Sequence, residues 1–236
     1  VKTEEELKAK VNEELTHEKE HQNEDAFKFS IDSVLLAEFV DINLRTKNII
    51  DFCSGNAPIP MILSTKFDKN IVGVEIQKNI YDLGIKSIKL NKINNINYLN
   101  MNVKDVVDYF DYKFDILTCN PPYFKYNNNS VINVNEEKAI ARHEISITLE
   151  DIVNCASKIL RDSGSVYLVH RPERLVEIID LFKKYHFGLR KLEFVYDNIN
   201  SNSCFLLIEA KYKCKDDLKI LKPLYIDKYL ESVKWN

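Results

Sequence analysis

Short apolar runs alternate with longer helical patterns over most of the chain. The β-rich runs predict strands at Ile49 to Phe52, Ile71 to Glu75, Ile96 to Leu99, Phe114 to Cys119 and Ser165 to His170. Helical periodicity predicts helices between them, at Pro58 to Phe67, Gln77 to Leu90 and Leu149 to Leu160. Strands that alternate with helices imply βαβ crossovers, so this pattern predicts a parallel, doubly wound sheet.

The last third of the chain follows a different pattern. Leu189 to Tyr196 and Cys204 to Tyr212 alternate apolar and polar residues, and a polar turn over residues 197–202 joins them. Two alternating runs around such a turn predict an antiparallel hairpin. The predicted fold class is therefore α/β, a Rossmann-like sheet of seven strands that is mostly parallel and ends in a C-terminal antiparallel hairpin.

The segments before the first strand predict the domain organisation. Residues 1–21 are rich in lysine and glutamate, with a thin apolar line, and are expected to form a charged N-terminal segment. A helix with a serine or aspartate cap is predicted at Asp32 to Val40. A chain of 236 residues has room for one sizeable α/β core, so residues 22–236 are expected to form a single domain.

Composition excludes several classes of protein. The apolar runs fall well short of the ~18 residues that a membrane span needs. The N-terminus is charged rather than apolar, which disfavours a secretory signal and predicts a cytoplasmic location. The five cysteines are scattered without a CxxC pair, so neither a disulfide framework nor a metal site is expected. A net charge of −3 means that a nucleic acid would have to bind a local basic patch.

The loop after the first strand has the composition of a nucleotide-binding turn. In open α/β sheets, ligands bind at the carboxyl ends of the strands where the strand order reverses. The candidate cofactor-binding residues in this loop are Asp51, Cys53, Ser54, Gly55 and Asn56. Small residues let the backbone approach a ligand, and the next helix offers free amides. The loop lacks GxGxxG, which disfavours a nicotinamide dehydrogenase, and a plain strand-to-helix turn is the alternative interpretation.

An acidic residue lies at or just after the end of each of the first three strands. Asp51 suits the ammonium group of a methionine moiety, which a dinucleotide lacks. Glu75 ends the second strand about 20 residues further on, a spacing that suits hydrogen bonds to ribose hydroxyls. Asp105 follows the third strand, where an adenine amino group would lie, and a helix cap is its equally open alternative. Ile76 and Val106, the next residues along the chain, complete this candidate site.

Asn120-Pro121-Pro122-Tyr123 directly follows the fourth strand and is the candidate catalytic signature. An exocyclic amine or carboxamide nitrogen is a weak nucleophile because its lone pair is delocalised. Two acceptors, the Asn120 side-chain oxygen and the Pro121 carbonyl, would favour a pyramidal nitrogen. The prolines restrict the backbone, and Tyr123 offers a face on which a planar substrate stacks. A simple turn is the alternative, which the position at the strand end disfavours.

With these motifs the chain resembles the bacterial tRNA1(Val) adenine-37 N6-methyltransferases, a family of class I S-adenosylmethionine-dependent enzymes. The resemblance covers residues 22–225. It is carried by Phe27 to Ala37, Asp51 to Asn56, Asn120 to Phe124, Ala141 to Glu144 and His170 to Leu175. It implies S-adenosylmethionine as cofactor, S-adenosylhomocysteine as product and tRNA as partner, with methylation at N6 of the adenosine 3′ to the anticodon. A monomer or a weak dimer is expected.

The resemblance also assigns residues near the cofactor and reveals two departures, one of which is that the first twenty residues differ from the usual start of the family. It implies that Phe29 and Asp32 pack over the cofactor and that Asn120 contacts it as well. Where the family continues its cofactor loop with glycine and an aliphatic residue, this chain has Ala57-Pro58. The Ala57 methyl group is therefore expected near the path of the cofactor.

Other acceptors and one non-catalytic function are alternatives. Glutamine N5-methyltransferases acting on release factors share the Asn-Pro-Pro-Tyr signature but resemble one another in a preceding helical domain, for which fifty residues before Asp51 leave too little room. DNA adenine methyltransferases usually carry a large recognition insertion, whereas residues 125–140 form only a polar, asparagine-rich loop. Methylation of another RNA, or RNA binding without catalysis, is also compatible with the sequence.

Aromatic and basic residues are candidates for RNA contacts. The candidate substrate-binding residues are Tyr123, Phe124, Lys125, Arg142, Arg171, Arg174, Lys211 and Lys213. Basic side chains neutralise phosphates, and an anticodon loop already presents unpaired bases, so little extrusion energy would be needed. An ordinary solvated face is the alternative interpretation of the lysines.

Overall fold

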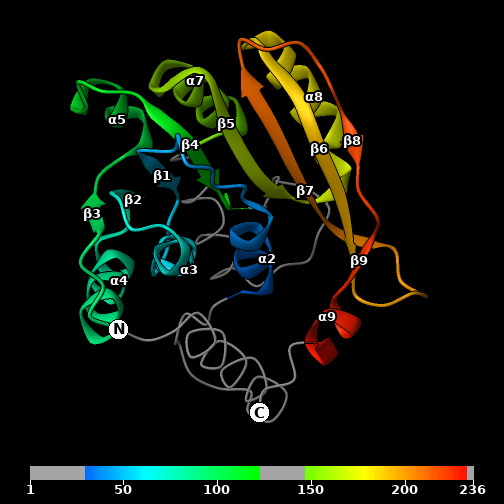
Figure 1. Cartoon of the computed structure of the whole chain (residues 1–236), viewed down its shortest axis with the longest axis horizontal. Coiled ribbons are helices and arrows are strands. Elements are labelled where there is room, and N and C mark those ends of the chain that lie inside the picture. Colours follow the sequence, from blue (N-terminus) through cyan, green and yellow to red (C-terminus); the bar gives the residue numbers. More distant parts are fainter. Residues whose placement is uncertain (1–29, 123–146, 233–236) are drawn as a thin grey trace, which may run out of the picture.

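The computed structural model describes residues 30–122 and 147–232 (Figure 1). The helices are α2 (Ile31–Phe39), α3 (Pro58–Lys66), α4 (Lys78–Leu90), η1 (Val103–Asp105), α5 (Val106–Tyr109), α7 (Leu149–Ile159), η2 (Pro172–Arg174), α8 (Leu175–Lys184) and α9 (Ile226–Ser232). The strands are β1 (Ile49–Phe52), β2 (Ile71–Glu75), β3 (Ile96–Asn100), β4 (Phe114–Cys119), β5 (Leu160–His170), β6 (Phe187–Tyr196), β7 (Ser203–Tyr212), β8 (Lys219–Ile220) and β9 (Leu224–Tyr225).

These strands form one mixed sheet in the order β3-β2-β1-β4-β5-β7-β6-β8, with β9 also paired to β6. Strands β1 to β5 are parallel, whereas β7 lies antiparallel between β5 and β6 (Figure 1). The strand order reverses at β1, which pairs with β2 on one side and with β4 on the other. The exit loops of β1 and β4 therefore leave the sheet next to each other, at the position where open α/β sheets bind ligands.

The predicted α/β class and the C-terminal hairpin are confirmed, and the strand count needs a correction. The described residues contain nine strands rather than seven, because β8 and β9 add two residues each alongside β6. Two-residue strands carry no alternating pattern, so periodicity could not find them. Strand β5 also begins five residues earlier than predicted, at Leu160.

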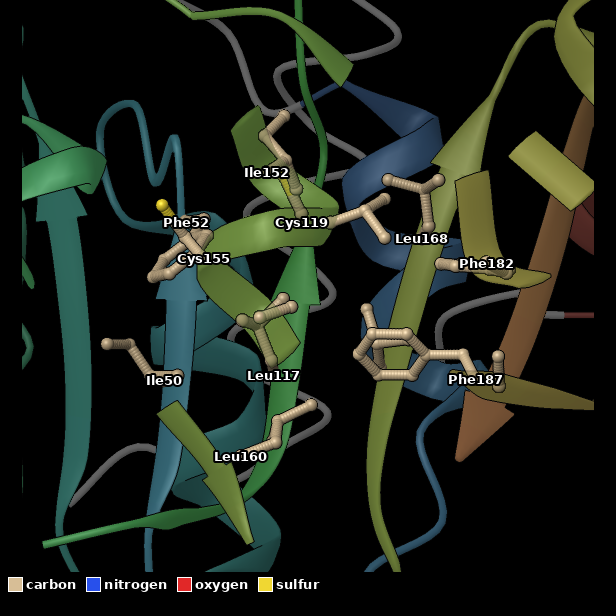
Figure 2. Packing of buried hydrophobic residues seen from close by; sticks show 14 of the residues in the cluster. Ile50, Phe52, Leu117, Cys119, Ile152, Cys155, Leu160, Leu168, Phe182 and Phe187 are labelled. Carbon is tan, nitrogen blue, oxygen red and sulfur yellow. The ribbon is translucent and has the colours of Figure 1, made fainter. Parts of the chain in front are cut away.

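Helices cover both faces of the sheet, and the sheet separates the core into two apolar clusters. Helices α7 and α8 pack on one face together with Ile50, Leu117 and Cys119, as Figure 2 shows. Helices α2 and α3 pack on the other face against Ile49 and Ile116. Successive residues of one strand thus enter opposite clusters, and every residue of β1, β2 and β4 is buried. Because both faces of these strands are buried, their sequences are nearly continuous apolar runs.

The described residues include no helix that is long and apolar enough to cross a membrane. All five cysteines lie within the described residues and are free thiols. No group of three or more histidine, cysteine, aspartate or glutamate side chains in this part of the chain is arranged to hold a metal ion.

Candidate active site

The exit loop of β1 has an alternating left-handed backbone. Cys53, Gly55 and Ala57 have φ angles of 55°, 58° and 71°. Only Gly55 adopts this conformation without a steric penalty, which is about 1–2 kcal/mol for a residue with a side chain. Cys53 and Ala57 therefore have a backbone conformation that is unfavourable for their residue types, so contacts with other parts of the protein must stabilise the loop.

Hydrogen bonds from β2 hold this loop. The Ser54 amide donates to the Val74 carbonyl (2.9 Å), and the Gly55 amide donates to Glu75 Oε2 (3.0 Å). The other oxygen of Glu75 accepts from the Gln77 amide (2.8 Å). Glu75 is almost fully buried, whereas the next residue, Ile76, is 44% exposed. A fixed carboxylate beside an exposed apolar side chain suits a ligand with one polar and one planar apolar part, such as a nucleoside.

Tyr98 on β3 contacts and supports the loop after β1, and the sequence pattern did not identify it as a site residue. Its hydroxyl donates to the Gly55 carbonyl, and its ring stacks on Tyr81 at a centroid distance of 5.2 Å. Burial raises the pKa of Tyr98 far above its usual value, so the phenol remains a donor. A Cβ at Gly73 or Gly84 would lie 2.6 or 2.5 Å from the Tyr98 ring. Glycines inside a strand and inside a helix were the sequence signal for this close packing.

This packing predicts an unusual effect of alanine in helix α4. Gly→Ala in a helix interior normally stabilises by about 1 kcal/mol. We expect Gly84→Ala to destabilise the protein instead, by about 1–3 kcal/mol, because the new methyl group would collide with the Tyr98 ring. Urea unfolding measures the change, with Ser87→Ala on the same helix as the control. A more stable Gly84→Ala protein would contradict the close packing of Tyr98 on α4.

Asp51, the last polar residue of β1, is completely buried. Its Oδ1 accepts from Thr118 Oγ1 (2.5 Å) and its Oδ2 accepts from Ser54 Oγ (2.6 Å). Burial raises the pKa of Asp51 to about 7, the two hydroxyl donors oppose this shift, and the negative charge of Glu75 adds to it. The carboxyl group therefore changes charge near neutral pH, at the start of the cofactor loop.

The catalytic signature follows β4 and lies beside this loop. Cys119 is the register partner of Phe52, so Asn120 leaves β4 where Cys53 leaves β1, and neighbouring strands are about 4.8 Å apart. Asn120 is half-buried, and its Nδ2 donates to Ser33 Oγ on helix α2 (2.9 Å). The structure thus brings Asn120, Asp51 and the cofactor loop together at one edge of the sheet.

A pocket of roughly 320 Å³ opens next to the two prolines. It is lined by Pro121, Pro122, Ile147, Thr148, Leu149, Glu150, Ile152, His170, Arg174 and Glu177. Its size falls at the lower end of small-molecule sites. Burial and the Arg174 cation lower the pKa of His170 to about 4, so the imidazole is neutral at physiological pH. Arg174 donates to both oxygens of Glu177 (2.6 Å each), which fixes its guanidinium at the pocket wall.

Most of the chain matches a known methyltransferase family. A model of the methyltransferase small domain matches residues 27–195. The chain belongs to this family. Two relatives are named tRNA1(Val) (adenine(37)-N6)-methyltransferase. The one from Cytophaga hutchinsonii is 23% identical over 178 residues, covering 75% of this chain and 74% of the relative. The one from Aliivibrio salmonicida is 25% identical over 181 residues, covering 76% and 75%.

Solved methyltransferase structures share the fold. A predicted O-methyltransferase from Agrobacterium tumefaciens superposes with a TM-score of 0.68 at 18% identity, covering 86% of this chain and 95% of that one. A class I S-adenosylmethionine-dependent methyltransferase from Listeria monocytogenes gives a TM-score of 0.62 at 13% identity, covering 98% and 78%. At these identities the likeness shows the class I methyltransferase fold.

Apart from the basic residues Arg171, Arg174, Lys211 and Lys213, the expected site residues fall into three groups. Near the β1 and β4 exits lie Asp32, Asp51, Cys53, Ser54, Gly55, Asn56, Glu75, Ile76, Asn120, Pro121 and Pro122. Asp105 is exposed after β3 and makes no side-chain cap bond to α5, while Val106 is buried. Phe29, Tyr123, Phe124, Lys125 and Arg142 lie outside the described residues, as do residues 1–21.

Ala57 departs from its expected position. The sequence predicts its methyl group near the path of the cofactor, but the residue is fully buried and belongs to the apolar cluster under α2 and α3. The methyl group thus contributes to the core, while the left-handed φ keeps the loop in shape.

The basic residues proposed for RNA binding do not gather in one place. Arg171 and Arg174 follow β5 at the catalytic edge, where the Arg171 guanidinium donates to the Cys204 carbonyl (3.3 Å). Lys211 pairs with Ser165 at the far end of β5, roughly 17 Å away at 3.3 Å per residue. Lys213 lies beyond it and forms an ion pair with Asp162 (2.9 Å). The lysines are therefore at the opposite edge of the sheet from Asn120.

Proposed function

We propose that this methyltransferase uses S-adenosylmethionine to methylate N6 of an adenosine in tRNA, at position 37 of tRNA1(Val). The observation that carries the proposal is the placement of Asn120-Pro121-Pro122 beside the left-handed loop of β1. The names of the two relatives support the choice of tRNA1(Val) and of position 37.

The residues at the β1 exit fit S-adenosylmethionine. Glu75 holds a buried carboxylate for the ribose hydroxyls, and Ile76 offers an exposed apolar side chain for the adenine ring. Asp51 offers a negative charge to the ammonium of the methionine moiety, directly or through water. When bound, S-adenosylmethionine supplies a methyl group on a positively charged sulfur atom.

Asn120 and Pro121 then prepare the acceptor nitrogen. The Asn120 side-chain oxygen and the Pro121 carbonyl accept the two N–H bonds of the adenine amino group, which favours a pyramidal nitrogen with its lone pair exposed. The two consecutive prolines fix the backbone that carries this carbonyl. Preorganised acceptors replace a strong base, so the amino proton need not leave before the nitrogen attacks.

The neutral imidazole of His170 and the Arg174–Glu177 pair border the same region. The neutral imidazole and the mutually paired charges of Arg174 and Glu177 are compatible with an uncharged purine, and the exposed Arg171 next to His170 can meet a phosphate. RNA fits this arrangement better than a protein glutamine, because a phosphate would pair with Arg171 and stacking favours a base.

Nucleoside mass spectrometry tests the proposal directly. Purified protein incubated with unmodified tRNA1(Val) and S-adenosylmethionine should produce N6-methyladenosine, and a tRNA with another base at position 37 should not. Transfer to release factor or duplex DNA, but not to tRNA, would contradict the assigned substrate. Isothermal titration without binding of S-adenosylmethionine by the folded protein would instead favour an RNA-binding module without catalysis.

The Tyr98 hydroxyl is expected to tune cofactor affinity. Removing its bond to the Gly55 carbonyl in Tyr98→Phe should weaken binding of S-adenosylmethionine about five- to tenfold, because the loop loses a support. Tyr167→Phe is the matched control, since Tyr167 is also buried and its hydroxyl accepts from the Asp41 amide (3.3 Å). Titration calorimetry measures the affinity of both variants for S-adenosylmethionine. Equal affinities of the two variants would contradict a role of the Tyr98 hydroxyl in cofactor binding.

A further inference from the structure

Helix α2 makes a direct polar contact with the catalytic signature. Ser33, in the first turn of this helix, accepts a hydrogen bond at Oγ from Asn120 Nδ2 over 2.9 Å, although the residues are 87 positions apart. Ser33 is only 4% exposed. The sequence pattern predicts a helix here but gives no reason to connect its serine with Asn120.

The surroundings of Ser33 hold its hydroxyl group in place. The Ser33 amide donates to Asp32 Oδ1 (2.7 Å) and to the Ser30 carbonyl (3.1 Å), and its Oγ lies 3.3 Å from Ser30 Oγ. Apolar residues that follow it, including Leu35 and Leu36, are buried against α3 and the sheet. Because the helix is anchored in the core, the Ser33 oxygen has little freedom to move away from Asn120.

The contact has a consequence for the orientation of the Asn120 amide. A carboxamide has an acceptor end and a donor end of nearly the same shape. If the group turned by 180°, its NH₂ would face the amino group of the substrate, and two donors would oppose each other. A serine hydroxyl donates as well as accepts, so Ser33 selects the Nδ2 end only while its own proton points elsewhere, and Ser30 Oγ, 3.3 Å away, is placed to accept that proton. With the proton engaged there, Ser33 Oγ offers an acceptor to Nδ2, and Oδ1 turns away from the helix.

We infer that Ser33 is a positioning residue that sets the orientation of the catalytic Asn120 amide through the Nδ2–Oγ hydrogen bond. The catalytic part of this inference rests on the proposed function. Helix α2 then has two roles, as a cover of the core and as a support of the catalytic loop. Through this hydrogen bond, the packing of α2 influences the rate of transfer.

The hydrogen bond itself is tested without any substrate. In protein labelled with ¹⁵N-asparagine, the Asn120 side-chain amide, assigned with Asn120→Asp, should show protons that exchange slowly with water. Ser33→Ala should speed this exchange about tenfold, and Ser33→Thr should preserve slow exchange because it keeps the hydroxyl. Equal exchange in the wild-type and Ser33→Ala proteins would overturn the inference.

Steady-state methyl transfer tests the consequence. Ser33→Ala should lower kcat about tenfold and leave both KM values within about twofold, because binding groups are untouched. Ser33→Thr should recover most of the rate. Ser157→Ala is the control, since that hydroxyl donates only to the Asn154 carbonyl in its own helix (2.7 Å). An unchanged kcat, or a threonine variant as slow as alanine, would overturn the positioning role.

The two measurements separate this inference from the proposed function. If the wild-type protein transfers no methyl group to tRNA, the proposed function fails, and the exchange experiment still decides whether Ser33 holds the amide. If tRNA is methylated and kcat is insensitive to Ser33, the function stands and the inference fails. A parallel loss of kcat and of thermal stability in Ser33→Ala, without recovery in Ser33→Thr, would show a purely structural role and also overturn it.

Discussion

Replacing Asn120 with alanine is expected to lower the rate of methyl transfer by a factor of a hundred to a thousand, the usual cost of removing one preorganised polar group from a reacting centre. The alanine variant loses the acceptor that favours a pyramidal amine, whereas the Pro121 carbonyl remains. Affinity for S-adenosylmethionine should stay within about threefold, because the loop of β1 and Glu75 are unchanged.

Single-turnover transfer to tRNA measures this rate without a contribution from product release. Asn120→Asp is an informative second variant, because its carboxylate keeps the acceptor but cannot donate to Ser33 Oγ. It should retain more activity than the alanine variant. Asn154→Ala on helix α7, outside the site, is the matched control and should transfer at the wild-type rate. Full activity of Asn120→Ala would show that the signature is only a turn.

The sequence pattern predicted the parallel part of the sheet closely, for a physical reason. Strands β1, β2 and β4 were predicted with the bounds they have, because burial on both faces makes them continuous apolar runs. The C-terminal part is less regular. After the buried Leu160, strand β5 continues with three exposed residues, including Arg161, and β8 and β9 are exposed or half-buried pairs, so none of these three strands shows a readable period.

The same limit applies to the site. Asp51, Glu75 and Asn120 were placed correctly at one edge, because the carboxyl ends of parallel strands meet there. Ser33 and Tyr98 were not found as site residues, since their roles depend on contacts between distant segments. Gly73 and Gly84, which make room for the Tyr98 ring, were the nearest signal for one of them.

Lys211 on β7, with Lys213 just after the strand, shows how topology constrains a functional hypothesis. A strand that pairs antiparallel with β5 must end at the edge where β5 begins, so Lys211 is carried away from the catalytic edge. The predicted hairpin makes β6 and β7 antiparallel to each other, but only the pairing of β7 with β5 fixes the direction of β7 in the sheet. Charge clusters near the end of a sequence are therefore better assigned to a face of the sheet only after the direction of their strand is known.

Asp51→Asn is expected to stabilise the cofactor-free protein and weaken its cofactor binding. The pKa of Asp51 is raised by burial from its usual 3.8 to about 7, so between these values the folded protein holds one proton more than the unfolded chain. The contribution of this group to the free energy of unfolding therefore falls as pH rises from about 4 to 7 and is constant above 7. An amide is neutral throughout and avoids this loss, so the variant should gain about 2–4 kcal/mol at pH 8 and almost nothing near pH 4.

The asparagine can satisfy the same neighbours. Its oxygen accepts from Thr118 Oγ1, and its NH₂ donates to Ser54 Oγ, whose proton turns to the main-chain carbonyl of residue 51, 3.0 Å away. Urea unfolding of both proteins across this pH range measures the difference. A stability gap that is the same at pH 4 and pH 8 would show that the buried carboxyl is not the source of the pH dependence.

The affinity for S-adenosylmethionine should change with pH in the direction opposite to stability. If the ionised carboxylate of Asp51 meets the ammonium of S-adenosylmethionine, wild-type binding should strengthen as pH rises through about 7. Binding should also release a proton from Asp51, which calorimetric titration in buffers of different ionisation heat detects. Asp51→Asn should bind at least tenfold more weakly at pH 8 and lose both effects. Glu193→Gln on β6 is the control, because burial also raises the pKa of Glu193 while the residue lies outside the site. Stability and cofactor binding thus make opposite demands on one buried carboxyl group, and the charge that costs the empty protein free energy is the charge that the bound ammonium compensates.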